Sequence, residues 1–194
     1  MRHAHIYMSL LLTLCILSPN GASQALAEEA QTQVSEAAPD TPISRYKAET
    51  EALIESLSEE QAKKYYLIRN THGIIRSVES VEAVVGKAAK SCKKNHKDLG
   101  KEIENRFVEW KLALHPIIKS SEDRLEKLVL IQDYAKPSDV KKHLKNFDLA
   151  ATYGEKLMKQ VPASDEESCT KLLKSMDATQ SNLIRLLKET IGLE

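Results

Sequence analysis

From Ser58 onward, apolar residues recur every three or four positions, and no stretch of strand length alternates between apolar and polar residues. This spacing puts the apolar side chains on one face of a helix. Four such amphipathic segments follow one another, with short turns between them: 58–95, 98–135, 137–161 and 164 onward. The fold class that we predict is all-α, an up-down-up-down four-helix bundle with long first and second helices.

Capping signals and prolines set the ends of these segments. Ser58-Glu59-Glu60-Gln61 and Ser164-Asp165-Glu166-Glu167 both have the capping-box spacing, in which each side chain satisfies a free backbone N–H. Pro137 suits the first turn of the third helix. Pro116 lies inside the second helix, where a proline removes one hydrogen bond and crowds a carbonyl. We therefore expect a kink or a break there, between 115 and 121.

The first 27 residues have the three parts of a secretory signal. Arg2 lies in a polar start, an apolar run covers 6–17, and Ala25-Leu26-Ala27 supplies the small-x-small motif that a signal peptidase reads. The apolar run is too short to cross a bilayer, which takes about 20 residues. We expect cleavage after residue 27 and export to the periplasm, with full secretion as the alternative. No later stretch is long and apolar enough to span a bilayer.

The segment 28–57 differs in composition from the rest. It has seven acidic and two basic residues, a net charge of −5, and its first part is rich in Ala, Gln, Ser, Thr and Pro. Such a segment has little to bury, so we predict an acidic, largely disordered leader and a single bundle domain over 58–194. Within the leader, 45–57 could extend the first helix or fray, and we keep it outside the core. The net charge of zero for the whole chain is a cancellation, and it gives no global field that would attract nucleic acid.

Two cysteines remain after the predicted cleavage, Cys92 and Cys169. They fall at the end of the first predicted helix and the start of the fourth, which meet at one end of an up-down bundle. An oxidising compartment favours a disulfide between them, and two buried free thiols are the alternative.

The predicted helix lengths conflict with that disulfide. The first two helices would be about 55 Å long and the last two about 35–40 Å, which would leave the two cysteines about 20 Å apart. A strong bend at Pro116, an offset third helix or the absence of the disulfide would resolve the conflict. We favour the bend.

Residue patterns of known chemistry are missing. The chain has no G-x-S-x-G, no C-x-x-C-H, no His-x-x-x-His, no Glu-x-x-His and no glycine-rich phosphate loop. We expect no enzymatic activity, no metal site and no cofactor. Non-covalent haem held by one His and one Met is kept as a second alternative, and its candidate ligands are Met158, Met176, His72 and His115. Core packing and surface polarity also explain these four residues.

Two surface features are candidates for partner binding. Five lysines follow a 3-4-3-4 spacing that would place them on one face of a continuous helix, although Asn95 and Gly100 argue against continuity: Lys87, Lys90, Lys94, Lys97 and Lys101. They would fit an acidic partner or an anionic surface, or else form a solvated face. Tyr65, Tyr66 and Arg69 form the second feature. Adjacent tyrosines cannot both face a core, and Tyr and Arg are typical interface anchors, although packing inside the protein explains them too.

The residues Leu57-Ser58-Glu59-Glu60-Gln61 resemble the L-T-x-x-Q element of small periplasmic helical chaperones of the Spy and CpxP kind. The resemblance covers five residues, has Ser in place of Thr, and has no second copy in the chain. It implies chaperone-like client binding as an alternative function. The function that we expect is that of an exported, non-enzymatic binding protein, with an unidentified protein or anionic partner in the cell envelope.

Overall fold

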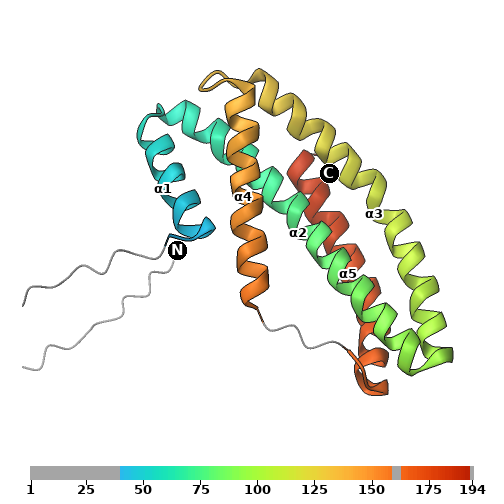
Figure 1. Cartoon of the computed structure of the whole chain (residues 1–194). Helices are drawn as coiled ribbons and strands as arrows, with labels where there is room; N and C mark the ends of the chain where they lie inside the picture. The colour runs from blue at the N-terminus through green and yellow to red at the C-terminus, as the bar shows by residue number, and fades with distance from the viewer. Residues whose placement is uncertain (1–39, 159–162, 193–194) are drawn as a thin grey trace, which may run out of the picture. The chain divides into compact units, whose positions relative to one another are not determined.

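The computed structural model describes residues 40–158 and 163–192, and these residues form five helices and no strand. The helices are α1 (Pro42–Glu55), α2 (Glu59–Asn95), α3 (Lys97–Ile131), α4 (Pro137–Leu157) and α5 (Glu166–Ile191) (Figure 1). The all-α class is confirmed. The predicted signal peptide and the first part of the predicted leader lie outside the described residues.

The prediction of four helices is wrong, because α1 lies in a segment that the sequence placed in the leader. Thr41 caps this helix through a reciprocal pair of hydrogen bonds with Ser44, and Pro42 occupies its first turn. The ring of Tyr46 then packs on α4, with centroids 5.0 Å from His143 and 5.5 Å from Phe147. Acidic residues on the exposed side of α1 hid this short helix from a reading of composition.

The predicted helix starts are partly confirmed. Ser58 caps α2, because its hydroxyl accepts from the Gln61 N–H at 3.3 Å and the Gln61 side chain accepts from the Ser58 N–H at 3.1 Å. The cap of α5 is Asp165 rather than Ser164. Its carboxylate accepts from the Ser168 N–H at 2.8 Å, since Asp165 stands three residues before Ser168.

Of the two outcomes expected near Pro116, the break is wrong, and the favoured bend stays a prediction. Helix α3 is continuous from Lys97 to Ile131 with Pro116 inside it, and it ends earlier than the pattern predicted. Gln132 ends it: the side-chain oxygen accepts from the N–H groups of Tyr134 and Ala135, and the side-chain amide donates to the Ala135 carbonyl at 2.6 Å.

Helices α2 and α3 form a long antiparallel hairpin that the other helices cover in two places. Helix α5 packs against both of them near the hairpin turn, and α4 packs on α1 and near the start of α2 (Figure 1). The up-down-up-down arrangement is therefore not confirmed. The conflict over helix lengths came from the assumption that all helices share one bundle length, whereas α4 and α5 lie along different stretches of the hairpin.

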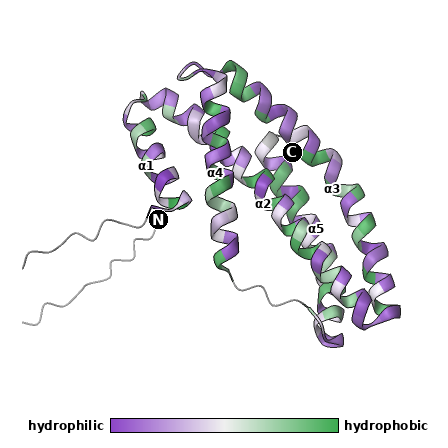
Figure 2. Cartoon of the chain, viewed as in Figure 1, coloured by the Kyte–Doolittle hydropathy of each residue, from purple (hydrophilic) through white to green (hydrophobic). Residues whose placement is uncertain are grey.

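The disulfide prediction is confirmed. Cys92 of α2 and Cys169 of α5 are bonded, with their Cα atoms 5.8 Å apart and no exposed surface on either residue. They belong to a core between α2, α3 and α5 that also contains Trp110, Leu114 and Met176. A smaller core between α2, α3 and α4 contains four buried apolar residues: Ile68, Val129, Val140 and Leu144. In Figure 2 the helices carry both hydrophobic and hydrophilic residues, as this packing requires.

Within the described residues, no helix has both the length and the apolar composition needed to cross a bilayer.

Gly100 of α3 lies directly against the backbone of α2. A Cβ atom there would lie 2.2 Å from the Cα atom of Lys93, which is backbone and cannot rotate away. We expect Gly100→Ala to lower the free energy of unfolding by about 3 kcal/mol, measured by urea denaturation. Gly154→Ala is the matched control, because its Cβ would meet only the Ile43 side chain at 3.9 Å. Equal stability of the two variants would show that the hairpin does not depend on this contact.

Candidate binding site

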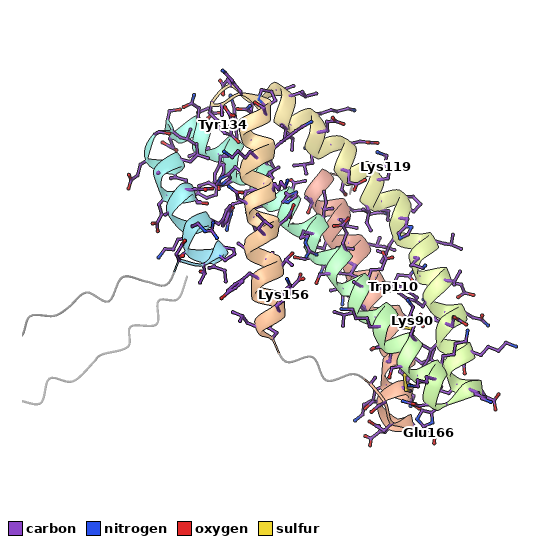
Figure 3. The ribbon with its side chains drawn as sticks, in the orientation of Figure 1. Lys90, Trp110, Lys119, Tyr134, Lys156 and Glu166 are labelled. Carbon is purple, nitrogen blue, oxygen red and sulfur yellow. A yellow bond between two sulfur atoms is a disulfide. The ribbon has the colours of Figure 1, made fainter. Side chains whose placement is uncertain are left out.

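A pocket of about 230 Å³ lies among α1, α2, the α3–α4 turn and α4. We call it the α1–α4 pocket. Apolar side chains and aromatic rings form most of its wall, and charged and amide groups are the rest of its lining: Leu53, Tyr65, Ile68, Tyr134, Ala135, Val140, His143, Leu144, Glu49, Asp139, Lys142 and Asn146. Figure 3 shows Tyr134 at the end of α4 that lies near the start of α2.

Tyr65 and His143 hold the wall of the pocket together. Tyr65 is 2% exposed, and its hydroxyl lies 3.0 Å from Nε2 of His143 on α4. Thr50 of α1 places its hydroxyl 3.4 Å from the same nitrogen. The His143 imidazole of α4 therefore contacts both α1 and α2. Tyr65 lies on the buried face of α2, and this face is the one that meets α4.

Burial favours the uncharged forms of Tyr65, Tyr134 and His143 in the pocket wall. It raises the pKa of Tyr65 well above its usual range and raises the pKa of Tyr134 to about 12. It lowers the pKa of His143, an effect that Glu49 opposes and Arg69 reinforces. A buried tyrosine with a raised pKa is a poor nucleophile, so the Tyr65–His143 pair is not suited to covalent catalysis.

Polar groups lie at the rim of the pocket. The Asn146 amide donates to the Glu49 carboxylate at 2.7 Å. The second ring nitrogen of His143, Nδ1, lies 4.0 Å from the same carboxylate. Lys142 and Asp139 are exposed. An apolar interior with a polar rim is the usual arrangement of a binding site, in which the interior provides affinity and the rim provides orientation.

The three residues predicted near the start of α2 have different surroundings. Tyr65 lines the α1–α4 pocket, and Tyr66 is 41% exposed beside it, as expected for adjacent tyrosines. Arg69 donates through Nε to the hydroxyl of Tyr46 at 3.2 Å, so it contributes to the packing of α1. Sequence reasoning missed Tyr46 and His143, because α1 was left out of the fold and a single histidine gives no pattern.

The predicted lysine stripe does not lie on one continuous helix. A turn at His96 separates α2 from α3, and it divides the five lysines into two groups: Lys87, Lys90 and Lys94 on α2, and Lys97 and Lys101 on α3. Lys93, which precedes Lys94 on α2, forms a 2.6 Å ion pair with Glu104 across the hairpin. Whether these lysines bind a partner stays a prediction.

The haem alternative gains no support from the positions of its candidate ligands. Met176 is buried in the α2–α3–α5 core, whereas Met158 is 65% exposed after α4. His72 places Nε2 2.8 Å from Asp148, and His115 is exposed on α3. In the part of the chain that the structure describes, no three His, Cys, Asp or Glu residues are grouped as metal ligands.

Protonation of His143 is expected to destabilise the fold. Because burial lowers its pKa in the folded chain, the unfolded chain binds more protons below about pH 6.5, so stability should fall as the pH is lowered through that value. Urea denaturation at about pH 7.5 and about pH 5 measures the difference. We expect His143→Gln to reduce this pH dependence. A variant with the full dependence of the natural chain would contradict the role given to His143.

Comparisons with protein-family models, curated proteins and solved structures find no match to this chain.

Proposed function

We propose that this chain is an exported, non-enzymatic binding protein whose α1–α4 pocket takes up one aromatic or branched apolar side chain of a protein partner. The observation that carries the proposal is the pocket itself, with apolar groups and neutral rings inside and Glu49, Asp139, Lys142 and Asn146 among its lining. Its volume is smaller than that of most small-molecule sites, which suits a side chain better than a large ligand.

The proposed location in the cell envelope rests on two observations. The first residues have the pattern of a secretory signal, and the Cys92–Cys169 disulfide suits an oxidising compartment such as the periplasm. Cell fractionation followed by N-terminal sequencing tests it. An exported chain that begins at Glu28 would support the proposal, and a cytosolic chain that keeps residues 1–27 would contradict it.

A model compound tests the pocket. N-acetyl-phenylalaninamide offers one apolar ring with peptide groups on either side, and such a fragment is expected to bind with a dissociation constant of roughly 1 mM. We expect it to shift the methyl NMR signals of Leu53, Val140 and Leu144 in a saturable way. N-acetyl-glycinamide, which lacks the ring, should leave them unchanged.

A variant that fills the pocket completes this test. Ala135 lines the pocket while its backbone is held by Gln132, so Ala135→Trp should occupy the space without removing a core residue. We expect the NMR shifts caused by N-acetyl-phenylalaninamide to disappear in this variant. They should remain in Ala178→Trp, because Ala178 lies on the exposed side of α5. Absence of the shifts in the natural chain would overturn the proposal, as would their persistence in Ala135→Trp.

A chaperone-like function is the second candidate, and one feature of the surface favours it. A hollow of about 100 Å³ between α2 and α3 is lined by Leu67, Ile68, Leu128 and Ile131, among others. Leu67 is 42% and Ile131 is 74% exposed, so an unfolded client could contact both. Light scattering of a client that aggregates on dilution from denaturant, without reductant, tests this candidate. Aggregation at an unchanged rate in the presence of excess chain would remove it.

A further inference from the structure

One face of the α2–α3 hairpin is left uncovered by the other helices that the structure describes. Helix α5 packs on the side that includes Val85, Ala89 and Cys92 of α2, and α4 packs near the start of α2. Between these contacts, the hairpin has a shallow groove of about 630 Å³ on another face of α2. We call it the open hairpin face. Figure 3 labels Lys90 on its α2 side.

The residues that α2 contributes to this groove have a symmetric pattern. They are Glu79, Glu82, Ala83, Gly86, Lys87 and Lys90. Counted from the midpoint between residues 84 and 85, each residue has a counterpart at the same distance on the other side. Ala83 corresponds to Gly86, Glu82 to Lys87, and Glu79 to Lys90. Two antiparallel copies of α2 related by a two-fold axis would therefore place every Glu opposite a Lys.

Helix α3 has one similar charge pair on a line of residues that passes through the groove at His115. About a centre between 111 and 112, Val108 has His115 as its counterpart and Lys101 has Glu122. These four residues repeat every seven positions, so they follow one line along the helix, and His115 lies in the groove. The contact between His115 and Glu82, at 3.0 Å, places the centres of the two helices at nearly the same level. One axis can therefore relate both helices to a second copy.

The end charges of this face form no ion pair in the part of the chain that the structure describes. They are Glu79, Lys90, Lys101 and Glu122, whereas neighbouring groups do form ion pairs, such as Lys93 with Glu104 and Lys119 with Asp123. The carboxylate of Glu122 also lies near enough to Glu79 to raise the pKa of Glu79, together with a larger effect of desolvation. Lysines of a second copy would relieve this repulsion between carboxylates.

Apolar side chains are exposed near the centre of the face. Leu112 is 70% and Val108 is 48% exposed, and Leu112 lies one turn of α3 from both Val108 and His115. The centre of the α2 line is made of two small residues, Ala83 and Gly86, which allow another helix to approach closely. The groove therefore combines apolar side chains with charged groups, which include Lys111 of α3, and such a mixture is compatible with a small, partly polar interface.

We propose that two copies of this chain associate through the open hairpin face, antiparallel and about a two-fold axis, with Glu79 and Glu122 of each copy opposite Lys90 and Lys101 of the other. The short length of the face implies a small interface and a transient dimer. This proposal is independent of the α1–α4 pocket, which lies elsewhere on the hairpin.

Sedimentation velocity of the purified, disulfide-bonded chain over a range of concentrations tests the proposal. We expect a reversible shift from monomer to dimer that weakens as salt is added, because the end contacts are electrostatic. A chain that stays monomeric up to about 1 mM would overturn the proposal, since no useful association remains beyond that dissociation constant.

Charge reversal identifies the face. Lys90→Glu/Lys101→Glu and Glu79→Lys/Glu122→Lys should each raise the dimer dissociation constant at least about tenfold. A mixture of the two variants should form a one-to-one dimer, because every end contact is then again between opposite charges. The matched control is Lys171→Glu/Lys174→Glu, which changes two exposed lysines of α5 and should dimerise as the natural chain does.

The failures are distinct. Unchanged association in both reversal variants would show that another surface forms the dimer, and would overturn the proposal. If the mixed variants stay monomeric, the antiparallel arrangement is overturned. All four changed residues are exposed, so circular dichroism and a thiol assay should show an intact fold in every variant.

Discussion

Replacing both cysteines with alanine, Cys92→Ala with Cys169→Ala, is expected to lower the free energy of unfolding by about 4 kcal/mol. The disulfide joins residues 77 positions apart, so it restricts a large part of the unfolded chain. It also ties α5 to the end of α2, next to a hairpin turn that α1 and α4 do not cover. For a domain of this size, the loss corresponds to a melting temperature lower by roughly 8–16 °C.

Differential scanning calorimetry with and without reductant measures this effect. The natural chain should lose the same stability when it is reduced, whereas the double alanine variant should be insensitive to reductant. The variant therefore serves as its own control for effects of the reductant on other groups. A melting temperature within about 3 °C of the natural chain would contradict a structural role for the disulfide.

Replacing Trp110 with alanine is expected to cost about 4 kcal/mol of unfolding free energy. Trp110 is the largest fully buried side chain, and it lies in the core that joins α2, α3 and α5, with its ring 5.8 Å from that of Phe107. Removing it leaves a cavity that helices tied by a disulfide cannot easily close. Figure 3 shows Trp110 in the stretch of the hairpin covered by α5.

Urea denaturation followed by circular dichroism measures this loss, since the variant has no tryptophan left for fluorescence. Leu130→Ala is the control, because Leu130 is on the same helix and 58% exposed, so its removal should change stability by less than about 0.5 kcal/mol. A Trp110→Ala loss as small as that of the control would mean that α5 contributes little to the fold.

Local signals in the sequence predicted local structure well. Patterns within a few residues predicted the all-α class and the start of α2 at Ser58. The Cys92–Cys169 disulfide followed because only two cysteines remain after the predicted cleavage. The start of α5 was one residue off, because Ser164 and Asp165 both have acceptable capping side chains and only the backbone decides between them.

Arrangement in space could not be read in the same way. The break at Pro116 was wrong because a proline removes only one hydrogen bond, and the packing of a 35-residue helix on both sides of it can compensate. Helix α1 was missed because its stability comes from contacts with α4, such as that between Tyr46 and His143, which no local pattern records.

The candidate site shows the same division. Tyr65 was singled out by its place beside Tyr66 and Arg69, but its partners come from α1 and α4, which are far away in sequence. The spacing of the lysine stripe assumed one continuous helix, whereas the turn at His96 divides the five lysines between α2 and α3. Two of its members, Lys90 and Lys101, enter the proposed dimer on different helices.

Site-specific photo-cross-linking in the native cell tests the proposed binding function most directly. A photoreactive phenylalanine analogue placed at Asn146, at the rim of the α1–α4 pocket, should form an adduct with a partner protein. The same analogue at Ala178 on α5 should not, and Ala135→Trp should abolish the adduct at Asn146. Adducts of equal yield at both positions, or an adduct that persists when the pocket is filled, would contradict the proposal that this pocket binds the partner.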